Sequence, residues 1–177
     1  PRSFSLWLGS EKSPLLVYDP EHTSWVTSAR QLFGHYAFGG VTGNPGDVAS
    51  TALREPWQNG FAALALLDAN RDQKVSGDEL DGLALWFDGN RDAIVQKGEL
   101  KTLSEAGVVA LYYKWDRRDD ETGDLWASVG YERVVNGKTV RGRAVDWYSP
   151  TFASKHEAVE ALRAMFQAKG GSKRQDF

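Results

Sequence analysis

The chain has 177 residues, a net charge of −3 and a pI of about 5.6, a balance that argues against a broad nucleic-acid-binding surface. It contains no cysteine, which excludes disulfides and thiolate metal sites. No run of about 18 apolar residues is present, so no membrane span is expected, and a hydrophobic content of 41% is enough for one sizeable core.

The first predicted elements are two strands and a helix. Apolar residues alternate with small ones from Ser3 to Leu8, which predicts a strand, and the apolar run from Leu15 to Tyr18 predicts a second. From Trp57 to Leu67 the apolar residues recur at helical spacing, and Asn59 is a candidate cap. We therefore expect a helix that ends just before Asp68.

Two 12-residue stretches follow, DANRDQKVSGDE and DGNRDAIVQKGE, and they repeat one pattern of oxygen donors. Each has a carboxylate at position 1, an amide at position 3, a carboxylate at position 5 and a glutamate at position 12, and position 7 offers its backbone carbonyl. Calcium takes six to eight oxygens, and the EF-hand loop supplies them at this spacing. The sequence therefore predicts two Ca²⁺ sites, with the ligands Asp68, Asn70, Asp72, Lys74 (backbone) and Glu79 in the first loop, and Asp88, Asn90, Asp92, Ile94 (backbone) and Glu99 in the second.

The alternative interpretation is a pair of solvated acidic turns, but repetition at every ligand position favours calcium. Position 6, normally a glycine with φ > 0, is Gln73 or Ala93 here. A side chain in that geometry costs about 1 kcal/mol. Weak sites, with a Kd of about 10⁻⁴–10⁻³ M, are typical of extracellular modules. We therefore expect a secreted or extracellular protein, with the periplasm as the alternative compartment.

Helical spacing continues after each loop. From Glu79 to Phe87 the pattern predicts one short helix, whose apolar face comprises Leu80, Leu83, Ala84 and Phe87. Beyond Glu99 a further helix carrying Leu100, Leu103 and Ala106 is predicted to stop at Gly107.

The last third of the chain predicts mainly strands. Val108–Trp115 is expected to be a strand, and residues 114–124 an exposed polar loop. A hairpin is expected over residues 125–148, turning at Asn136-Gly137. Ser154 and Glu157 form a predicted capping box for a last helix, whose inward face would comprise Ala158, Leu162, Met165 and Phe166.

Several of these strings, in this order, resemble a known family: LFG at 32–34, then NGFAALALLDANRD, LALWFDGNRD, GELKTLSEAGV and ALYY. The chain resembles, over residues 15–147, the EF-hand-like calcium-binding region of large secreted bacterial proteins of the repeats-in-toxin or hemolysin type. The glycine- and aspartate-rich nonapeptide repeats of that family are absent. The resemblance implies a secreted calcium-binding module and no particular catalytic activity.

In that family an earlier calcium loop precedes LFG, and here its counterpart starts at Asp19 and keeps a valine, Val26, at position 8. The other matching positions differ from the family's Asn, Asp and Glu: they hold Glu21, Thr23 and Gln31. We expect this degenerate loop to hold no calcium, because a divalent ion would lack compensating carboxylates. We expect Val26 to pair in antiparallel fashion with Val75 or Val95.

The expected fold class is α+β, with EF-hand-like loops and helices packed on an antiparallel sheet or hairpin. One domain over residues 1–177 would comprise N-terminal strands with the degenerate loop (1–56), the paired loops (57–107), the hairpin region (108–150) and a C-terminal helix and tail (151–177). Calcium is expected to stabilise this fold.

No catalytic constellation is visible, so the chain is not expected to be an enzyme. The three histidines, His22, His35 and His156, lie far apart in sequence without a serine or cysteine motif. The seven tryptophans are more typical of a core, but exposed aromatics would point to a protein or saccharide partner. The alternative function is a secreted hydrolase, or a carbohydrate- or protein-binding adhesion module, that uses calcium structurally.

Overall fold

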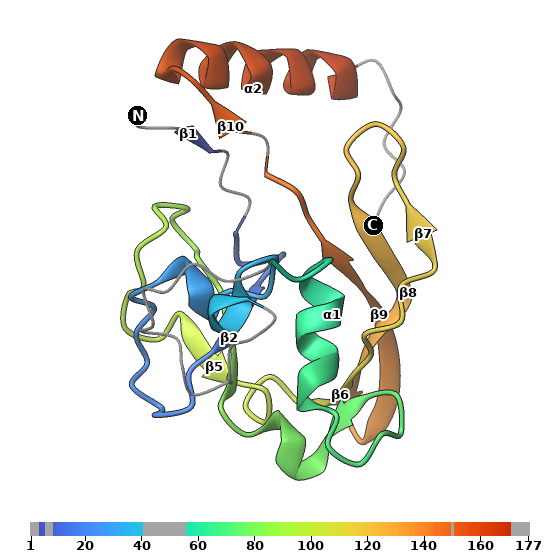
Figure 1. Cartoon of the computed structure of the whole chain (residues 1–177). Helices are drawn as coiled ribbons and strands as arrows, with labels where there is room; N and C mark the ends of the chain where they lie inside the picture. Colours follow the sequence, from blue (N-terminus) through green and yellow to red (C-terminus); the bar gives the residue numbers. More distant parts are fainter. Residues whose placement is uncertain (1–3, 6–8, 41–55, 150, 171–177) are drawn as a thin grey trace. The chain divides into compact units, whose positions relative to one another are not determined.

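The computed structural model describes residues 4–5, 9–40, 56–149 and 151–170 (Figure 1). The chain divides into two compact units, one formed by Gly9–Tyr148 and a smaller one that combines Pro1–Leu8 with Ser149–Phe177. Antiparallel strands dominate the described residues, which contain two α-helices. The larger unit carries the loops predicted to bind calcium.

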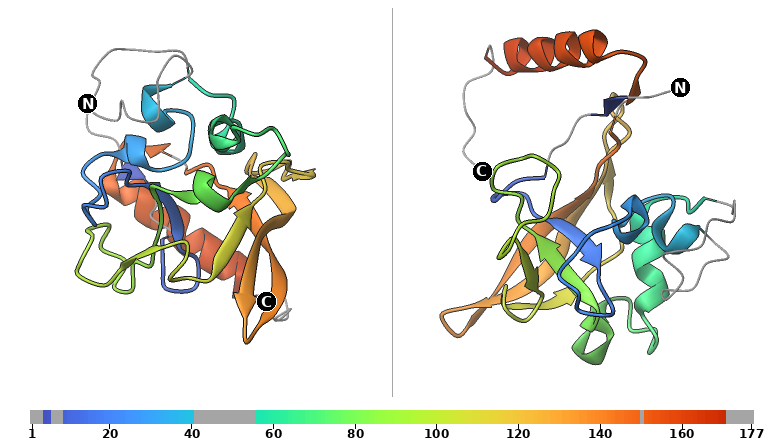
Figure 2. Two further views of the ribbon diagram at one scale, coloured as in Figure 1. Left: turned by 90° about the horizontal axis from the view of Figure 1, so that it is seen from below. Right: turned by 90° about the vertical axis from the view of Figure 1, so that its left-hand side faces the viewer.

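The larger unit contains two antiparallel sheets (Figure 2). The three-stranded sheet has the order β2–β4–β5, and its strands are β2 (Leu15–Tyr18), β4 (Leu83–Trp86) and β5 (Leu100–Thr102). The five-stranded sheet has the order β3–β6–β8–β7, with β9 also paired to β8. Its strands are β3 (Val75–Ser76), β6 (Val108–Leu111), β7 (Arg117–Arg118), β8 (Leu125–Val135) and β9 (Lys138–Asp146).

Several predicted elements are confirmed. Strand β2 has the predicted bounds, and β8 and β9 form the predicted hairpin, with φ of +50° at Asn136 and +72° at Gly137. The helix predicted before the first loop is α1 (Gly60–Leu64), which continues into the 3₁₀ helix η3 (Ala65–Leu67). The Asn59 side chain caps it by accepting a hydrogen bond from Ala62 N at 2.7 Å.

The predicted α+β class with EF-hand helices is wrong, because a short 3₁₀ helix and a strand follow the first loop and a strand follows the second. In place of a helix from Glu79 to Phe87 the chain forms the 3₁₀ helix η4 (Gly77–Leu80) and then β4. Gly82 separates the two with φ of +74°, a conformation that a continuous helix does not allow. Strand β4 is an apolar run, with Leu83, Ala84 and Trp86 buried. A short apolar run fits a buried strand as well as a helix.

The helix predicted after Glu99 is also absent from the structure. Leu100–Thr102 forms β5, which pairs with β4, and Phe87 N donates to Glu99 O at 2.8 Å. The second loop therefore connects two strands of one hairpin. Only a few residues separate Glu99 from Gly107, too few for a helix to be stable without tertiary support, so sheet pairing prevails.

The main core lies beneath these elements and is built around Phe38, which is fully buried. The Phe38 ring makes edge-to-face contacts with Tyr18 and Phe33, at centroid distances of 5.0 and 5.4 Å. Phe33 belongs to the LFG string, and two further 3₁₀ helices flank that string, η1 (Ala29–Gln31) and η2 (Ala37–Gly39). The LFG string thus anchors the degenerate loop to the core. The remaining buried members are Ala37, Ala63, Leu64, Val75, Leu83, Leu103, Val108 and Leu111.

The smaller unit pairs β1 (Phe4–Ser5) with β10 (Thr151–Phe152) and carries α2 (Lys155–Gly170). The predicted capping residues do open α2, since Glu157 N donates to Ser154 Oγ at 3.2 Å. Of the predicted inward face, Ala158 is buried. The side chains of Leu162, Met165 and Phe166, and the rest of the strand predicted from Ser3 to Leu8, fall outside the described residues.

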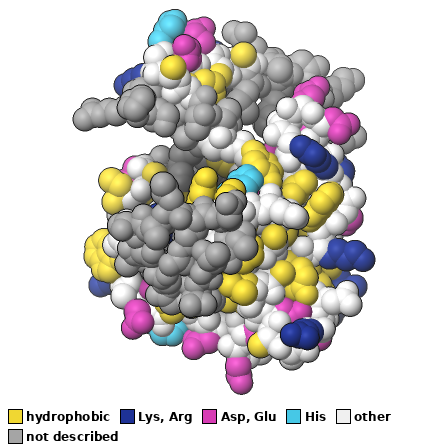
Figure 3. All heavy atoms as spheres, in the orientation of Figure 1, with side chains coloured by type: hydrophobic (Ala, Val, Ile, Leu, Met, Phe, Trp, Pro, Cys, Tyr) yellow, Lys and Arg dark blue, Asp and Glu magenta, His cyan; other side chains and the backbone are white. Residues whose placement is uncertain are grey.

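None of the helices in the described residues is long and apolar enough to cross a bilayer. On the face drawn in Figure 3, lysine and arginine side chains are scattered and form no single basic patch. Hydrophobic side chains and one histidine gather near the middle of that face.

Candidate functional site

The first loop is organised by the carboxylates at its two ends. Asp68, which is largely buried, accepts hydrogen bonds from Asp72 N at 3.1 Å and from Gln73 N at 2.9 Å. At the other end Glu79 accepts from the backbone N–H groups of Ala69, Asn70 and Ser76, at 2.9, 3.1 and 3.1 Å. The side chain that closes the loop therefore bonds the backbone at both the beginning and the end of the loop.

The predicted carboxylate ligands of this loop come together in space. Oxygen atoms of Asp68, Asp72 and Glu79 all lie within 4.8 Å of one another. Oxygens bound to one calcium ion at about 2.3–2.6 Å stand at most about 5 Å apart, so the spacing and chemistry of these donors fit Ca²⁺. Asn70 Oδ1 lies beside them and accepts from Asp72 N at 2.9 Å. The Lys74 Nζ lies 3.7 Å from Asp72 Oδ2. The predicted ligand is the backbone carbonyl of Lys74 and not this side chain.

The second loop repeats the hydrogen bonds of the first. The side chain of Asp88 is fully buried and accepts from Asp92 N at 3.3 Å and Ala93 N at 3.0 Å. Glu99 accepts from Gly89 N at 3.2 Å and from Gln96 N at 3.0 Å. The backbone of the second loop is therefore held at both ends in the same way as that of the first.

The second loop differs from the first in its middle carboxylate. Asp92 Oδ2 accepts hydrogen bonds from the side-chain amides of Asn90 and Gln96, at 2.9 and 2.8 Å. Within the described part of the chain, a group of three such close carboxylates is found in the first loop and not in the second. The exposed Ile94, which stands at position 7, donates its N–H to Asp92 Oδ1 at 2.8 Å.

Both loops follow the same backbone path. Position 6 has a positive φ in each, +72° at Gln73 and +60° at Ala93, as the loop pattern predicted. Position 4 also has a positive φ, +62° at both Arg71 and Arg91, which the sequence did not indicate. Non-glycine residues hold this left-handed conformation at a cost, so the hydrogen bonds to the loop carboxylates must compensate for it.

Two aromatic residues outside the loops contact their carboxylates. Tyr113 Oη donates to Asp68 Oδ2 at 2.6 Å, which holds the pKa of Asp68 below its usual value and raises the pKa of Tyr113 to about 12. Trp86 Nε1 donates to Glu99 Oε2 at 3.3 Å. Loop spacing could not identify either residue, because Trp86 ends β4 and Tyr113 lies just after β6, both outside the 12-residue pattern. The only signal for Tyr113 was its place in the string ALYY.

The pairing predicted for the degenerate loop is wrong. Val26 and Val95, both among the described residues, lie in no strand or bridge, and Val75 pairs with Leu111 of β6. The degenerate loop is attached to its neighbours through an isolated antiparallel bridge between Val17 and Leu32. In the first loop, therefore, position 8 pairs with a later strand of the five-stranded sheet and not with another loop.

Two hollows lie away from the loops. One of about 450 Å³ is lined by residues that include His35, Trp115 and Tyr148. The rings of His35 and Tyr148 are 5.2 Å apart, and Tyr148 also bonds the side chain of Asp146. Burial raises the pKa of Asp146, although a hydrogen bond from Gly60 N at 2.7 Å opposes the shift.

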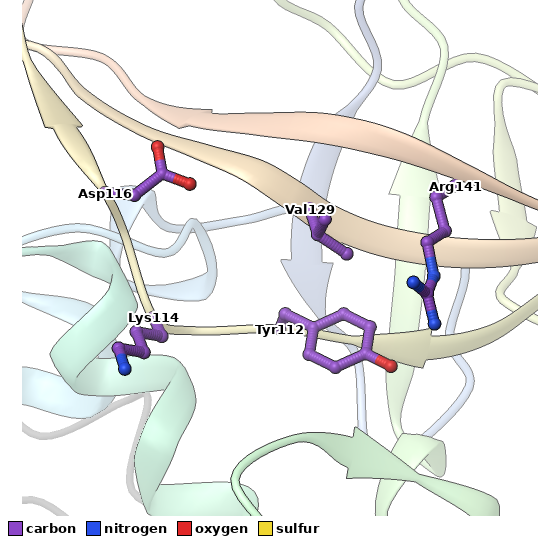
Figure 4. A pocket seen from close by; sticks show the side chains of 5 residues that line it. All are labelled: Tyr112, Lys114, Asp116, Val129 and Arg141. Atoms are coloured by element: carbon purple, nitrogen blue, oxygen red, sulfur yellow. The ribbon is translucent and has the colours of Figure 1, made fainter.

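The other hollow, of about 240 Å³, is shown in Figure 4. In that view the hydroxyl end of Tyr112 points toward the Arg141 guanidinium, and Val129 lies to one side of the two. The Arg141 guanidinium is engaged by Glu132, with Nε 2.8 Å from Oε1. Of the two cations that line this hollow, Lys114 and Arg141, Arg141 is therefore already paired.

Comparison with known proteins gives a bacterial relative and a family. The chain is 28% identical over 144 residues to the iron-regulated protein FrpA of Neisseria meningitidis serogroup C. The match covers 79% of this chain but 12% of FrpA, so the chain corresponds to a small part of that bacterial protein. Neither FrpA nor the family below carries the name of an enzyme.

The family model for the SPM domain matches residues 4–147, which include both acidic loops, the degenerate loop and the hairpin. The matched residues make up most of the chain. The chain therefore belongs to the SPM domain family.

Proposed function

We propose that the chain is a calcium-binding module of a secreted or cell-surface bacterial protein, in which Ca²⁺ stabilises the fold. The observation that carries this proposal is the close approach of Asp68, Asp72 and Glu79 in a loop whose sequence has the calcium ligand pattern. Asn70 and the backbone carbonyl of Lys74 would complete the first site. The second site would use Asp88, Asn90, Asp92, the carbonyl of Ile94, and Glu99.

The two sites are expected to differ in strength. In the first loop the three carboxylates already converge, whereas in the second Asp92 is held by two side-chain amides that an ion would have to displace. The hydrogen bond from Tyr113 favours the ionised form of Asp68, which is the form that binds a cation. We therefore assign the tighter site to the first loop.

Both sites are expected to be weak, which fits an environment rich in calcium. The non-glycine residues with left-handed backbone at position 6 and the small number of carboxylates support a Kd of about 10⁻⁴–10⁻³ M. The likeness of the motifs to secreted repeats-in-toxin proteins and the match to part of a large bacterial protein support an extracellular location. Bound calcium would supply positive charge among the loop carboxylates and so stabilise the folded state.

The test is a calorimetric titration of the full chain with CaCl₂ after treatment with a chelator. We expect two sites, of which Glu79→Gln removes one and Glu99→Gln the other. Glu105→Gln is the matched control, because Glu105 also caps a backbone N–H, that of Thr102 at 2.8 Å, but lies outside both loops. Magnesium should bind much more weakly, since it gives up its water reluctantly.

Thermal unfolding gives an independent measure. At 1 mM calcium and a Kd of about 10⁻⁴ M, each site stabilises the folded state by about 1.4 kcal/mol. The melting temperature in calcium should therefore exceed that in chelator, and the two loop variants should each lose part of the difference. Equal melting temperatures in calcium and chelator, together with no binding heat, would refute the proposal.

Ligand binding at the hollow lined by Trp115 is a second candidate function. Trp115 is 42% exposed and shares the hollow with the polar residues Gln58, Asn59 and Arg118, an arrangement suited to a saccharide. Binding of oligosaccharides would quench or shift tryptophan fluorescence in the wild type and not in Trp115→Ala. An unchanged spectrum across a panel of saccharides would exclude this function for the hollow.

A further inference from the structure

The loop that begins at Asp19 has the backbone of a calcium loop. Positions 4 and 6, His22 and Ser24, have φ of +49° and +59°, the same left-handed pattern as in the two acidic loops. Asp19 accepts hydrogen bonds from Thr23 N at 3.0 Å and Ser24 N at 2.9 Å, which matches the role of the first aspartate in the other loops. The first half of this loop is therefore a third copy of the same structure.

The end of the loop also matches, with glutamine in place of glutamate. Ser28 and Gln31 form a capping box at the start of η1, as Ser76 and Glu79 do at the start of η4. Gln31 Oε1 accepts from Ser28 N at 3.1 Å, and Glu79 Oε2 accepts from Ser76 N at 3.1 Å. Gln31 thus stands in the structural position of the closing glutamate, one residue later along the chain.

The two closing side chains differ in their other polar atom. The second oxygen of Glu79 accepts the N–H of Ala69, at position 2 of its loop. Position 2 of the Asp19 loop is Pro20, which has no N–H to donate. A carboxylate oxygen directed at Pro20 would lack the hydrogen bond that Ala69 N donates to Glu79. Gln31 has a side-chain N–H₂ donor in place of that oxygen.

The amide protons of Gln31 reach two backbone carbonyls. Nε2 donates to Tyr18 O and to Trp25 O, both at 3.2 Å, and the Gln31 side chain is buried. Trp25 stands at position 7, where the acidic loops are expected to offer a carbonyl to calcium. In the Asp19 loop that carbonyl already has a donor from within the chain.

We propose that the side-chain amide of Gln31 takes the place of the cation in this loop, so that the loop stays closed without metal. The amide carries no net charge, which suits a loop whose only buried carboxylate, among the described residues of 19–31, is Asp19. The closed loop ends at Leu32 and Phe33. Leu32 forms the bridge to Val17, and the Phe33 ring packs on Phe38. This attachment to the core therefore persists when calcium is removed.

The test is the substitution Gln31→Glu, studied in chelator so that calcium at the other loops plays no part. At pH 7 the new carboxylate faces the carbonyls of Tyr18 and Trp25 without a proton to donate. We expect the melting temperature to fall by about 4 °C or more. The same change at Gln58, which is exposed, should leave the melting temperature nearly unchanged.

A second arm distinguishes the lost donor from general damage. Near pH 4 a glutamate at this position would be protonated, and its O–H can donate to one carbonyl as the amide did. The difference in melting temperature between wild type and variant should therefore become smaller as the pH falls from 7 to 4. A variant that fails to fold at pH 7 should fold near pH 4. No loss at pH 7, or a loss that does not change with pH, would overturn the proposal. Because all arms are run in chelator, failure of the proposed calcium binding would leave this comparison intact.

Discussion

Replacing Ala93 with glycine should stabilise the protein, although glycine usually destabilises. Ala93 has φ of +60°, a left-handed conformation that costs an alanine about 1–2 kcal/mol. Glycine avoids this cost but gains freedom in the unfolded chain, which offsets about 0.4–1 kcal/mol. The Ala93 side chain is exposed, so no packing is lost. The net gain is about 0.8 kcal/mol, or roughly 3 °C in melting temperature for a chain of this size.

Thermal unfolding followed by circular dichroism in chelator measures this difference without a contribution from metal. Ala62→Gly is the matched control, because Ala62 lies in α1 with right-handed backbone geometry. There the same substitution should destabilise by about 1 kcal/mol. The two variants should therefore shift the melting temperature in opposite directions. A loss in Ala93→Gly as large as that in Ala62→Gly would show that the loop backbone is not left-handed at position 6.

Gly107→Ala should lower the melting temperature more than Gly137→Ala, since both have φ of +72° but a Cβ at Gly107 would lie 2.9 Å from a backbone oxygen while one at Gly137 would meet open space. Equal losses would remove the steric explanation. Asp146→Asn should be stabilising relative to wild type at pH 7 and less so near pH 4. Burial raises the folded-state pKa of Asp146. Ionisation of Asp146 therefore lowers the free energy of unfolding of the wild type as the pH rises above the unfolded pKa of about 3.9. Parallel stability profiles for the two proteins would contradict this. Tyr113→Phe should weaken calcium binding at the first loop by about tenfold and leave the second loop unchanged, which calorimetry of the variant would measure.

Local chemistry predicted the loops themselves and the hairpin. The spacing of Asp68, Asp72 and Glu79 identified residues that the structure brings together, and the Asn136-Gly137 turn defined the β8–β9 hairpin. These features depend on contacts between nearby residues, which in the hairpin extend from the turn as far as the pair Leu125↔Asp146. A single sequence contains all the information that such short-range contacts require.

The segments between the loops were predicted wrongly because their apolar pattern has two solutions. Leu80, Leu83, Ala84 and Phe87 fit one face of a helix, but a strand buried on both sides needs no alternation. What selects the strand is pairing with β2, more than 60 residues earlier, at the register Tyr18↔Leu83. Periodicity within the segment carries no information about that partner. The same limitation explains why Tyr113, a contact of the first loop, could not be identified from loop spacing.

The three loops separate two roles that the EF-hand pattern combines. In each loop the first aspartate accepts the N–H groups of positions 5 and 6, so the turn is made by the chain itself whichever residue closes the loop. The closing residue decides what fills the centre: a glutamate adds negative charge that a cation can neutralise, whereas Gln31 adds a donor. If calcium binds as proposed, the charge of the closing residue, more than the shape of the loop, would therefore determine which of these loops depends on metal. The same reasoning explains how short strands can replace the helices around such loops, since the bonds that shape each loop lie almost entirely within it.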